Sequence, residues 1–215
     1  MSTTREPIAA KRPRNPEATK ASILAAARAE FAERGLDGGR VDSIARRAGA
    51  NKQLVYYYFG SKDEIYRAAL EASYADIRSL ERELDLAALP PREAMIRLID
   101  FSLDYLAQHR EFIRMLADEN AHGARHVRNS DAARQTNSPL LEMIAETLRR
   151  GEKEGIFRTG VDPLELYVSI AGMTFFYFAN GLTMSAIFGR DLTQPEAISS
   201  YRDHIVSFTL AGLRP

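Results

Sequence analysis

The chain has 215 residues, 45% of them hydrophobic, with 29 Lys and Arg balanced by 29 Asp and Glu and with no cysteine. This composition excludes a disulfide framework and thiolate chemistry. The lack of strand-like alternation and the abundance of alanine, leucine, arginine and glutamate favour an all-α fold. The polar, basic start has no apolar signal-peptide region, so we expect a cytoplasmic protein.

The zero net charge hides an asymmetry between the two ends of the chain. Residues 1–62 hold 12 Lys and Arg against 6 Asp and Glu, so the remainder is acidic by the same margin. A basic end on an acidic body indicates a polyanion-binding module joined to a part that does not bind nucleic acid. Residues 1–15 form a flexible basic tail, which fits a minor-groove arm and a merely solvated tail equally well.

The next stretch has the signals of three short helices. Asn15 is an N-cap type followed by a first-turn proline, and an apolar helical stripe then leads to a first glycine turn. A second helix over Asp42–Ala48 ends at Gly49, where a left-handed residue ends a helix at little cost. Asn51 is a typical N-cap for a third helix. Two short helices across a tight glycine turn form a helix-turn-helix, whose second helix enters the major groove of DNA.

The rest of the chain reads as a helical body, so about nine helices are expected in all. Ser61 and Glu64 predict a capping box at the start of the fourth helix. Gly123–Ser138 is polar and predicts a loop or a frayed helix. The predicted helices of the body are Lys62 to about Asp85, Pro91–His109, Glu111–Asn120, Pro139–Glu154, Pro163–Phe188 and about Pro195–Gly212. We therefore predict a DNA-binding domain over residues 16–62 and a ligand-binding and dimerisation domain over residues 63–215.

The stretch Leu166–Phe188 has no charge over its whole length and would be long enough to span a bilayer. It contains polar residues and two glycines and has no flanking basic clusters, so we favour a helix buried between the body and a second subunit over a membrane helix.

Several motifs at matched spacing resemble the TetR family of bacterial transcriptional regulators. They are Phe31-Ala32-Glu33-Arg34-Gly35, Ile44-Ala45-Arg46-Arg47-Ala48-Gly49, Val55-Tyr56-Tyr57-Tyr58-Phe59 and Gly60-Ser61-Lys62-Asp63. The match covers about the first third of the chain and is specific, because spacing and residue type agree throughout. The resemblance implies a homodimer that binds a palindromic operator in double-stranded DNA, most often as a repressor, and that a small-molecule effector releases.

The first turn of the third helix is the part that meets base edges. Gln53 can bind an adenine edge, and Lys52 can reach guanine or a phosphate. The resemblance places phosphate contacts at Tyr56, Tyr57 and Lys62. Helical geometry keeps three consecutive residues off one face, so Tyr58 and Phe59 are assigned to the core. The predicted DNA-binding residues are Arg40, which replaces a common threonine of the family, Lys52, Gln53, Leu54, Tyr56, Tyr57 and Lys62.

An aromatic wall with a few polar anchors is typical of a small-molecule site. Such residues concentrate in the predicted helices over 91–120 and 163–188, although plain core packing fits any one of them about as well. The predicted ligand-binding residues are Phe101, Tyr105, Met115, Glu119, Asn120, Met173, Phe176, Tyr177 and Asn180. The family's dimers pair their last two helices, so Ile205 and Phe208 are the predicted dimer-interface residues.

An enzyme is not predicted, since no catalytic motif of the common classes occurs, and no cofactor is expected. Asp118, His122 and His126 are spaced as one helical face, with Glu119 adjacent, and could ligate a divalent metal. Gly123 interrupts that helix, so we predict a polar wall or a solvated face and no metal. The alternative from another class is a helical ligand-binding or catalytic protein with a vestigial helix-turn-helix.

Overall fold

The computed structural model describes residues 15–215, except for the side chains of residues 136–138. The predicted basic tail lies outside the described residues apart from Asn15. The described part is all-helical, as predicted, and contains ten α-helices and a short 3₁₀ turn. They are α1 (Pro16–Gly38), α2 (Val41–Arg47), α3 (Lys52–Phe59), α4 (Lys62–Arg82), η1 (Leu86–Ala88), α5 (Pro91–Gln108), α6 (Arg110–Ala121), α7 (Arg125–Arg128), α8 (Asp131–Lys153), α9 (Pro163–Phe188) and α10 (Pro195–Gly212).

Side-chain caps fix the starts of α1, α3 and α4. The carboxamide oxygens of Asn15 and Asn51 each accept a first-turn backbone N–H, at 3.0 and 2.7 Å. Ser61 and Glu64 form a capping box, in which each side chain accepts the other residue's backbone N–H at 3.2 Å. Each cap satisfies an N–H that a helix start leaves without an intrahelical acceptor, so the three predicted starts are confirmed.

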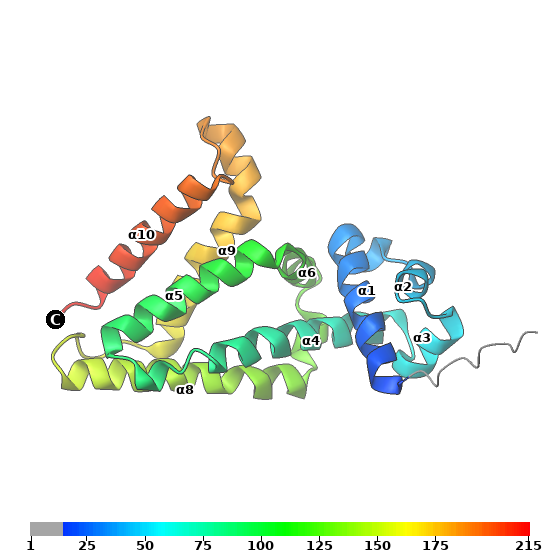
Figure 1. The fold of residues 1–215 in the computed structure, drawn as a ribbon, viewed down its shortest axis with the longest axis horizontal. Coiled ribbons are helices and arrows are strands. Elements are labelled where there is room, and N and C mark those ends of the chain that lie inside the picture. The colour runs from blue at the N-terminus through cyan, green and yellow to red at the C-terminus, as the bar shows by residue number, and fades with distance from the viewer. Residues whose placement is uncertain (1–14) are drawn as a thin grey trace, which may run out of the picture.

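The helices are arranged as a small group joined to a long body (Figure 1). Helices α1, α2 and α3 form the group at one end, and α4 runs from it into the body with α8 packed alongside. Helix α6 lies where the body meets α1, while the ends of α8 and α10 lie at the far side of the body from α3. Two elements, α4 and α6, therefore connect the N-terminal group to the body.

Each of the two parts has its own cluster of buried side chains. The N-terminal cluster contains Ile23, Ile44 and Val55, all fully buried, and extends along α4 as far as Leu70. It also includes Met115 from α6. The second cluster is centred on α5 and α8 and is completed by α9 and α10. The predicted division between residues 62 and 63 stays a prediction, because α4 contributes to both cores.

Of the two alternatives predicted for Gly123–Ser138, a loop or a frayed helix, the loop is wrong because most of the segment is helical. Residues 125–128 form α7, and α8 begins at Asp131, where the Ser130 hydroxyl accepts the backbone N–H of Ala133 at 3.0 Å. The sequence places a helix start at Pro139, but this proline lies inside α8. A proline fits the helical φ and removes one hydrogen bond, which packing of α8 along α4 and α5 can offset.

Helix α9 has the bounds predicted for it. Among the described residues it is the one helix that length and apolar composition would allow to cross a membrane. It packs against α5, α6, α8 and α10, and about a quarter of its most apolar stretch, 28%, is buried inside the protomer. The rest of that stretch is not buried by the described part of the protomer.

Candidate DNA-binding surface and effector cavity

The helix-turn-helix is built by one turn and one anchoring residue. Gly49 closes α2 with φ of 61°, a left-handed conformation that glycine adopts without strain. Val55 of α3 is fully buried in the N-terminal core and sets the orientation of α3. The start of α3 then faces outward, with Lys52 and Gln53 both exposed.

The side chains predicted to contact DNA lie on the outer side of this unit. Tyr57 is 81% exposed and Tyr56 is 38% exposed, whereas Tyr58 and Phe59 are half-buried against the N-terminal core. This division matches the predicted one between an outer face and a core face. Such exposure is costly for an aromatic ring unless another surface covers it.

Three more of the predicted DNA-binding residues have partners or packing neighbours within the protein. They are Arg40, Lys52 and Leu54. Arg40 is exposed and precedes α2, and its backbone N–H donates to the buried carboxylate of Glu30 at 3.2 Å. The ammonium of Lys52 pairs with Asp42 at 2.9 Å, and Leu54 is half-buried. An exposed ion pair of this kind is weak, so Lys52 can exchange its partner for another anion at little cost.

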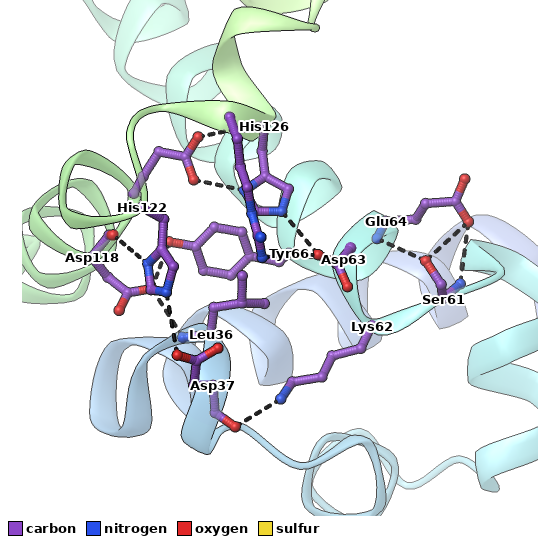
Figure 2. A network of polar contacts seen from close by, with 12 residues as sticks. Leu36, Asp37, Ser61, Lys62, Asp63, Glu64, Tyr66, Asp118, His122 and His126 are labelled. Carbon is purple, nitrogen blue, oxygen red and sulfur yellow. Dashed lines mark hydrogen bonds and ion pairs between the residues drawn. The ribbon is translucent and has the colours of Figure 1, made fainter.

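Lys62 stands at the start of α4, where free backbone N–H groups and the helix dipole favour an anion. Its Nζ donates to the backbone carbonyl of Asp37 at 3.0 Å, which ties the start of α4 to the end of α1 (Figure 2). Lys62 is half-buried, so its position depends on where the end of α1 lies.

A carboxylate from the body holds the end of α1. Asp118 of α6 accepts the Leu36 backbone N–H and the Tyr66 hydroxyl through the same oxygen, each at 2.9 Å (Figure 2). The helix breaks at Gly35, where φ is 66° and ψ is 179°, and this break frees the Leu36 N–H from an intrahelical acceptor. The other Asp118 carboxylate oxygen lies 2.7 Å from where a Cβ on residue 35 would stand. Glycine is therefore required at position 35 by both the backbone and the approaching carboxylate.

Sequence reasoning found Gly35 as part of a motif but missed this role of Asp118 and Tyr66. An apolar stripe on α4 that includes Tyr66 gives no signal of a partner 52 residues away. Burial first, and then the hydrogen bond to Asp118, raise the pKa of Tyr66 well above its usual range, so this hydroxyl stays a donor.

The residues considered for a metal site are used in other ways. Gly123 turns the chain after α6, so Asp118, His122 and His126 do not share one helix. The Nδ1 of His126 lies 2.7 Å from the buried carboxylate of Glu119, and its Nε2 lies 3.3 Å from Asp63 (Figure 2). Across the described residues, no group of three His, Cys, Asp or Glu has the arrangement of a metal site.

His122 lies between α6 and the end of α1. Its Nδ1 lies 2.8 Å from the backbone carbonyl of Asp118, and its Nε2 lies 3.4 Å from the Asp37 carboxylate. The backbone contact with Asp118 first, and the Asp37 carboxylate second, raise the pKa of His122 above its ordinary value of 6.5. The protonated imidazole therefore strengthens the contact between the two parts.

A cavity of about 330 Å³ lies in the body between α4, α5, α6 and α9. Its wall is mainly apolar and aromatic, and burial raises the pKa of Tyr74 to about 12, as expected for a poorly hydrated hydroxyl. The lining residues that bear on its chemistry are Tyr74, Arg78, Glu81, Ser102, Phe112, Asn120, Tyr167, Gly172, Thr174 and Phe175.

Most residues predicted to bind the ligand do not line this cavity, and Asn120 is the one that does. The assignment of Met115 is wrong, because it is fully buried in the N-terminal core. Glu119 is also misassigned, since its buried carboxylate accepts the backbone N–H groups of His126 and Val127 at 2.7 and 3.0 Å.

The other predicted ligand residues lie elsewhere in the body. Phe101 and Tyr105 pack on the body core, and the Tyr105 ring stacks on His109 with centroids 4.1 Å apart. Phe176 is exposed, and the Asn180 amide donates to its backbone carbonyl at 3.1 Å. The residues that line smaller surface pockets outside the cavity are Met173 and Tyr177.

An apolar surface covers the outer side of α9 and α10. Of the eleven exposed large hydrophobic side chains in the described part of the chain, seven lie on these two helices. Leu182 is 79% exposed and Phe208 is 62% exposed. Ile205, however, is fully buried in the body core, so its assignment to a dimer interface is wrong. A heptad-like pattern on a helix with two apolar sides does not reveal which side faces the core.

Both parts of the chain match known families. Residues 23–69 match bacterial regulatory proteins of the tetR family, and residues 91–208 match the tetracyclin repressor-like C-terminal domain. The chain therefore belongs to the TetR family of bacterial transcriptional regulators. This result supports a regulator over a helical protein with a vestigial helix-turn-helix, and the family consists of regulators rather than enzymes.

Particular relatives give the same result over most of the chain. The chain is 33% identical to the HTH-type transcriptional repressor NicS of Pseudomonas putida over 196 residues, or 91% of this chain and 92% of that relative. It is 36% identical to the HTH-type transcriptional repressor SCO4008 of Streptomyces coelicolor, over 74% of this chain and 78% of that protein. The structure of the ketosteroid transcriptional regulator KstR2 of Mycobacterium tuberculosis has the same fold, with a TM-score of 0.66, 22% identity and coverage of 96% and 97%.

Proposed function

We propose that this protein is a cytoplasmic repressor that binds a palindromic DNA operator as a homodimer and leaves it when a small molecule enters the cavity of the body. The observation that carries the proposal is the arrangement of α3. Val55 fixes one side of this helix in the core, while Gln53 and Tyr57 project from the other side with no protein surface over them. Residues 16–62 serve as the DNA-binding domain, and residues 63–215 bind the effector and the second subunit.

Two kinds of DNA contact follow from the positions of the side chains. Gln53 stands in the first turn of α3 and reads a base edge, whereas Lys62 at the start of α4 binds a phosphate. Gln53→Ala should therefore cost about 1–3 kcal/mol on the operator and relax the preference at one base position. Lys62→Ala should weaken binding to all duplexes by a similar factor and reduce the salt dependence.

The test uses fluorescence anisotropy with the DNA upstream of the protein's own gene and a random duplex of equal length, each at several salt concentrations. Gln53→Ala should lower affinity for the first duplex and leave the second unchanged. Equal losses on both duplexes for both variants would contradict the assigned roles. No binding of the unmodified protein to either duplex at low salt would contradict the DNA-binding function itself.

The dimer is proposed to form through the outer side of α9 and α10. Two half-sites in a palindrome require a two-fold protein. The exposed apolar side chains of these two helices support this proposal, and the most exposed on each helix are Leu182 of α9, at 79%, and Phe208 of α10, at 62%. Light scattering at micromolar concentration should report a dimer, and Leu182→Glu should convert it to a folded monomer with much weaker operator binding.

The effector is proposed to act through α6. Phe112, Leu116 and Asn120 line the cavity at helical spacing, while Asp118 on another side of α6 holds the end of α1. A ligand that favours a different position of α6 also favours a different position of Lys62 and α3, and linkage requires the operator to weaken ligand binding by the same factor.

A thermal-shift screen, followed by titration of hits against the protein–DNA complex, tests this mechanism. Asn120→Ala should raise the ligand concentration needed for release and leave ligand-free DNA affinity intact. Asn180→Ala makes the same chemical change outside the cavity and serves as its control. Equal release from both variants would place the effector elsewhere.

A further inference from the structure

The cavity wall contains one pair of buried, oppositely charged side chains. Arg78 and Glu81, both on α4, are 4% and 2% exposed and form an ion pair with each other. Arg78 also donates through Nη2 to the Tyr167 hydroxyl at 2.9 Å. No other charged side chain belongs to the described wall, so the wall is neutral as a whole.

The remaining polar groups of the wall are suited to accept hydrogen bonds. The Ser102 hydroxyl donates to the Leu98 carbonyl at 2.8 Å, and the Thr174 hydroxyl donates to the Ile170 carbonyl at 2.9 Å. With their protons committed to the backbone, these oxygens can only accept from a ligand. The Asn120 amide can donate or accept, and the rings of Tyr74, Phe112, Tyr167 and Phe175 form most of the rest.

The charge pair determines what a charged ligand would cost. An anionic ligand would share the Arg78 guanidinium with Glu81, so two buried anions would face one cation. A cationic ligand would likewise place two buried cations against the one Glu81 carboxylate. A buried charge without its own counter-ion is strongly unfavourable, whereas an uncharged ligand leaves the pair balanced.

We propose that the effector is an uncharged aromatic molecule of one or two rings that carries a hydrogen-bond donor. This proposal rests on the assignment of the cavity as the effector site. Stacking and edge contacts with the four aromatic rings supply affinity, and the accepting oxygens orient the ligand. A cavity of about 330 Å³ is large enough for such a molecule.

Anions and cations are not disfavoured equally. A carboxylate can take up a proton, and burial raises the pKa of Glu81 against the lowering effect of Arg78 and Arg82. Burial also raises the pKa of the Tyr105 hydroxyl, which interacts electrostatically with Glu81. A guanidinium has no comparable way to lose its charge. The expected order of affinity is therefore neutral, then anionic, then cationic.

The experiment measures binding of three probes of matched size, benzamide, benzoate and benzylamine, to the full-length protein by ligand-observed NMR and calorimetry. At pH 8, benzamide should bind at least about tenfold more tightly than benzoate, and benzylamine should not bind measurably. Because burial raises the pKa of Glu81, lowering the pH should improve benzoate binding as Glu81 takes up a proton, and should leave benzamide binding unchanged.

Three variants assign these effects to the cavity and to the pair. A Cβ at Gly172 meets no atom within 4 Å, so Gly172→Leu should fill the cavity and abolish benzamide binding, while Gly172→Ala should retain it. Glu81→Gln leaves Arg78 without its carboxylate, so it should raise the affinity for benzoate at least about tenfold and reverse the preference.

The proposal is overturned if benzoate or benzylamine binds the unmodified protein as tightly as benzamide, if none of the three binds, or if Glu81→Gln leaves the preference unchanged. These outcomes can be distinguished from a failure of the proposed function, because operator binding by the same protein preparation is measured in the absence of the three probes. Full DNA affinity with no probe binding overturns the ligand class alone, whereas loss of DNA binding at low salt overturns the function.

Discussion

Removal of the Asp118 carboxylate should loosen the contact between the N-terminal group and the body. This side chain accepts the Leu36 backbone N–H and the Tyr66 hydroxyl, each at 2.9 Å, and is 21% exposed. In Asp118→Ala the Leu36 N–H loses its acceptor, whereas the Tyr66 hydroxyl keeps the Met115 carbonyl at 3.2 Å. The N–H left without an acceptor and the lost charge-assisted hydrogen bond should together lower the free energy of unfolding by about 2–4 kcal/mol.

Asp118→Asn tests how much of this loss comes from charge. The amide keeps one oxygen that can accept from Leu36 or from Tyr66, but it presents an NH₂ group on its other side. We expect Asp118→Asn to lower the free energy of unfolding by about 1–2 kcal/mol, which is less than the loss for Asp118→Ala. Combining Asp118→Asn with Tyr66→Phe should give a coupling energy of about 1 kcal/mol, because the two side chains share a hydrogen bond.

The assay is urea unfolding followed by circular dichroism at a fixed protein concentration, since the proposed dimer would make the midpoint depend on concentration. Glu142→Gln on the exposed side of α8 makes the same carboxylate-to-amide change away from the contact and should shift the midpoint little. If Asp118→Ala were no less stable than Glu142→Gln, the hydrogen bonds to Leu36 and Tyr66 would not hold the two parts together.

Three further changes have definite expected results. Gly35→Ala should cost about 1–3 kcal/mol more than Gly49→Ala by urea unfolding, because position 35 has a glycine-only conformation and faces a carboxylate, while a Cβ at position 49 meets open space. The pKa of His122 is raised in the folded state, so its stabilising effect is complete below pH 6.5 and is lost as the pH rises through the folded-state pKa. The difference in urea midpoint between the unmodified protein and His122→Gln should therefore shrink from pH 6 to pH 8. Phe208→Glu should give folded monomers in light scattering, whereas Ile205→Glu should unfold the chain, which circular dichroism distinguishes.

The sequence predicts local features well because their causes are local. A cap such as Asn51 acts on an N–H three residues away, and Pro163 marks the first turn of α9 without reference to the rest of the chain. Burial of an apolar residue on a helix with two apolar sides depends on which neighbours pack there. The sequence therefore identifies Ile205 and Met115 as important apolar positions but assigns each to the wrong surface. The predicted helix start at Pro139 is wrong for a different reason, because α8 is already capped at Ser130.

The different sides of α6 explain why its residues were difficult to assign from the sequence. Phe112, Leu116 and Asn120 face the cavity, whereas Met115 and Asp118, on the same short helix, pack on the N-terminal group. A helix of 12 residues with both kinds of contact cannot shift toward one without changing the other, because packed interiors do not deform continuously. Movement of α6 by a ligand must therefore strain or release the end of α1, and through the Asp37 carbonyl it reaches Lys62 at the start of α4. In the proposed dimer, this chain of direct contacts would give a ligand in the cavity a physical route to the spacing of the two recognition helices.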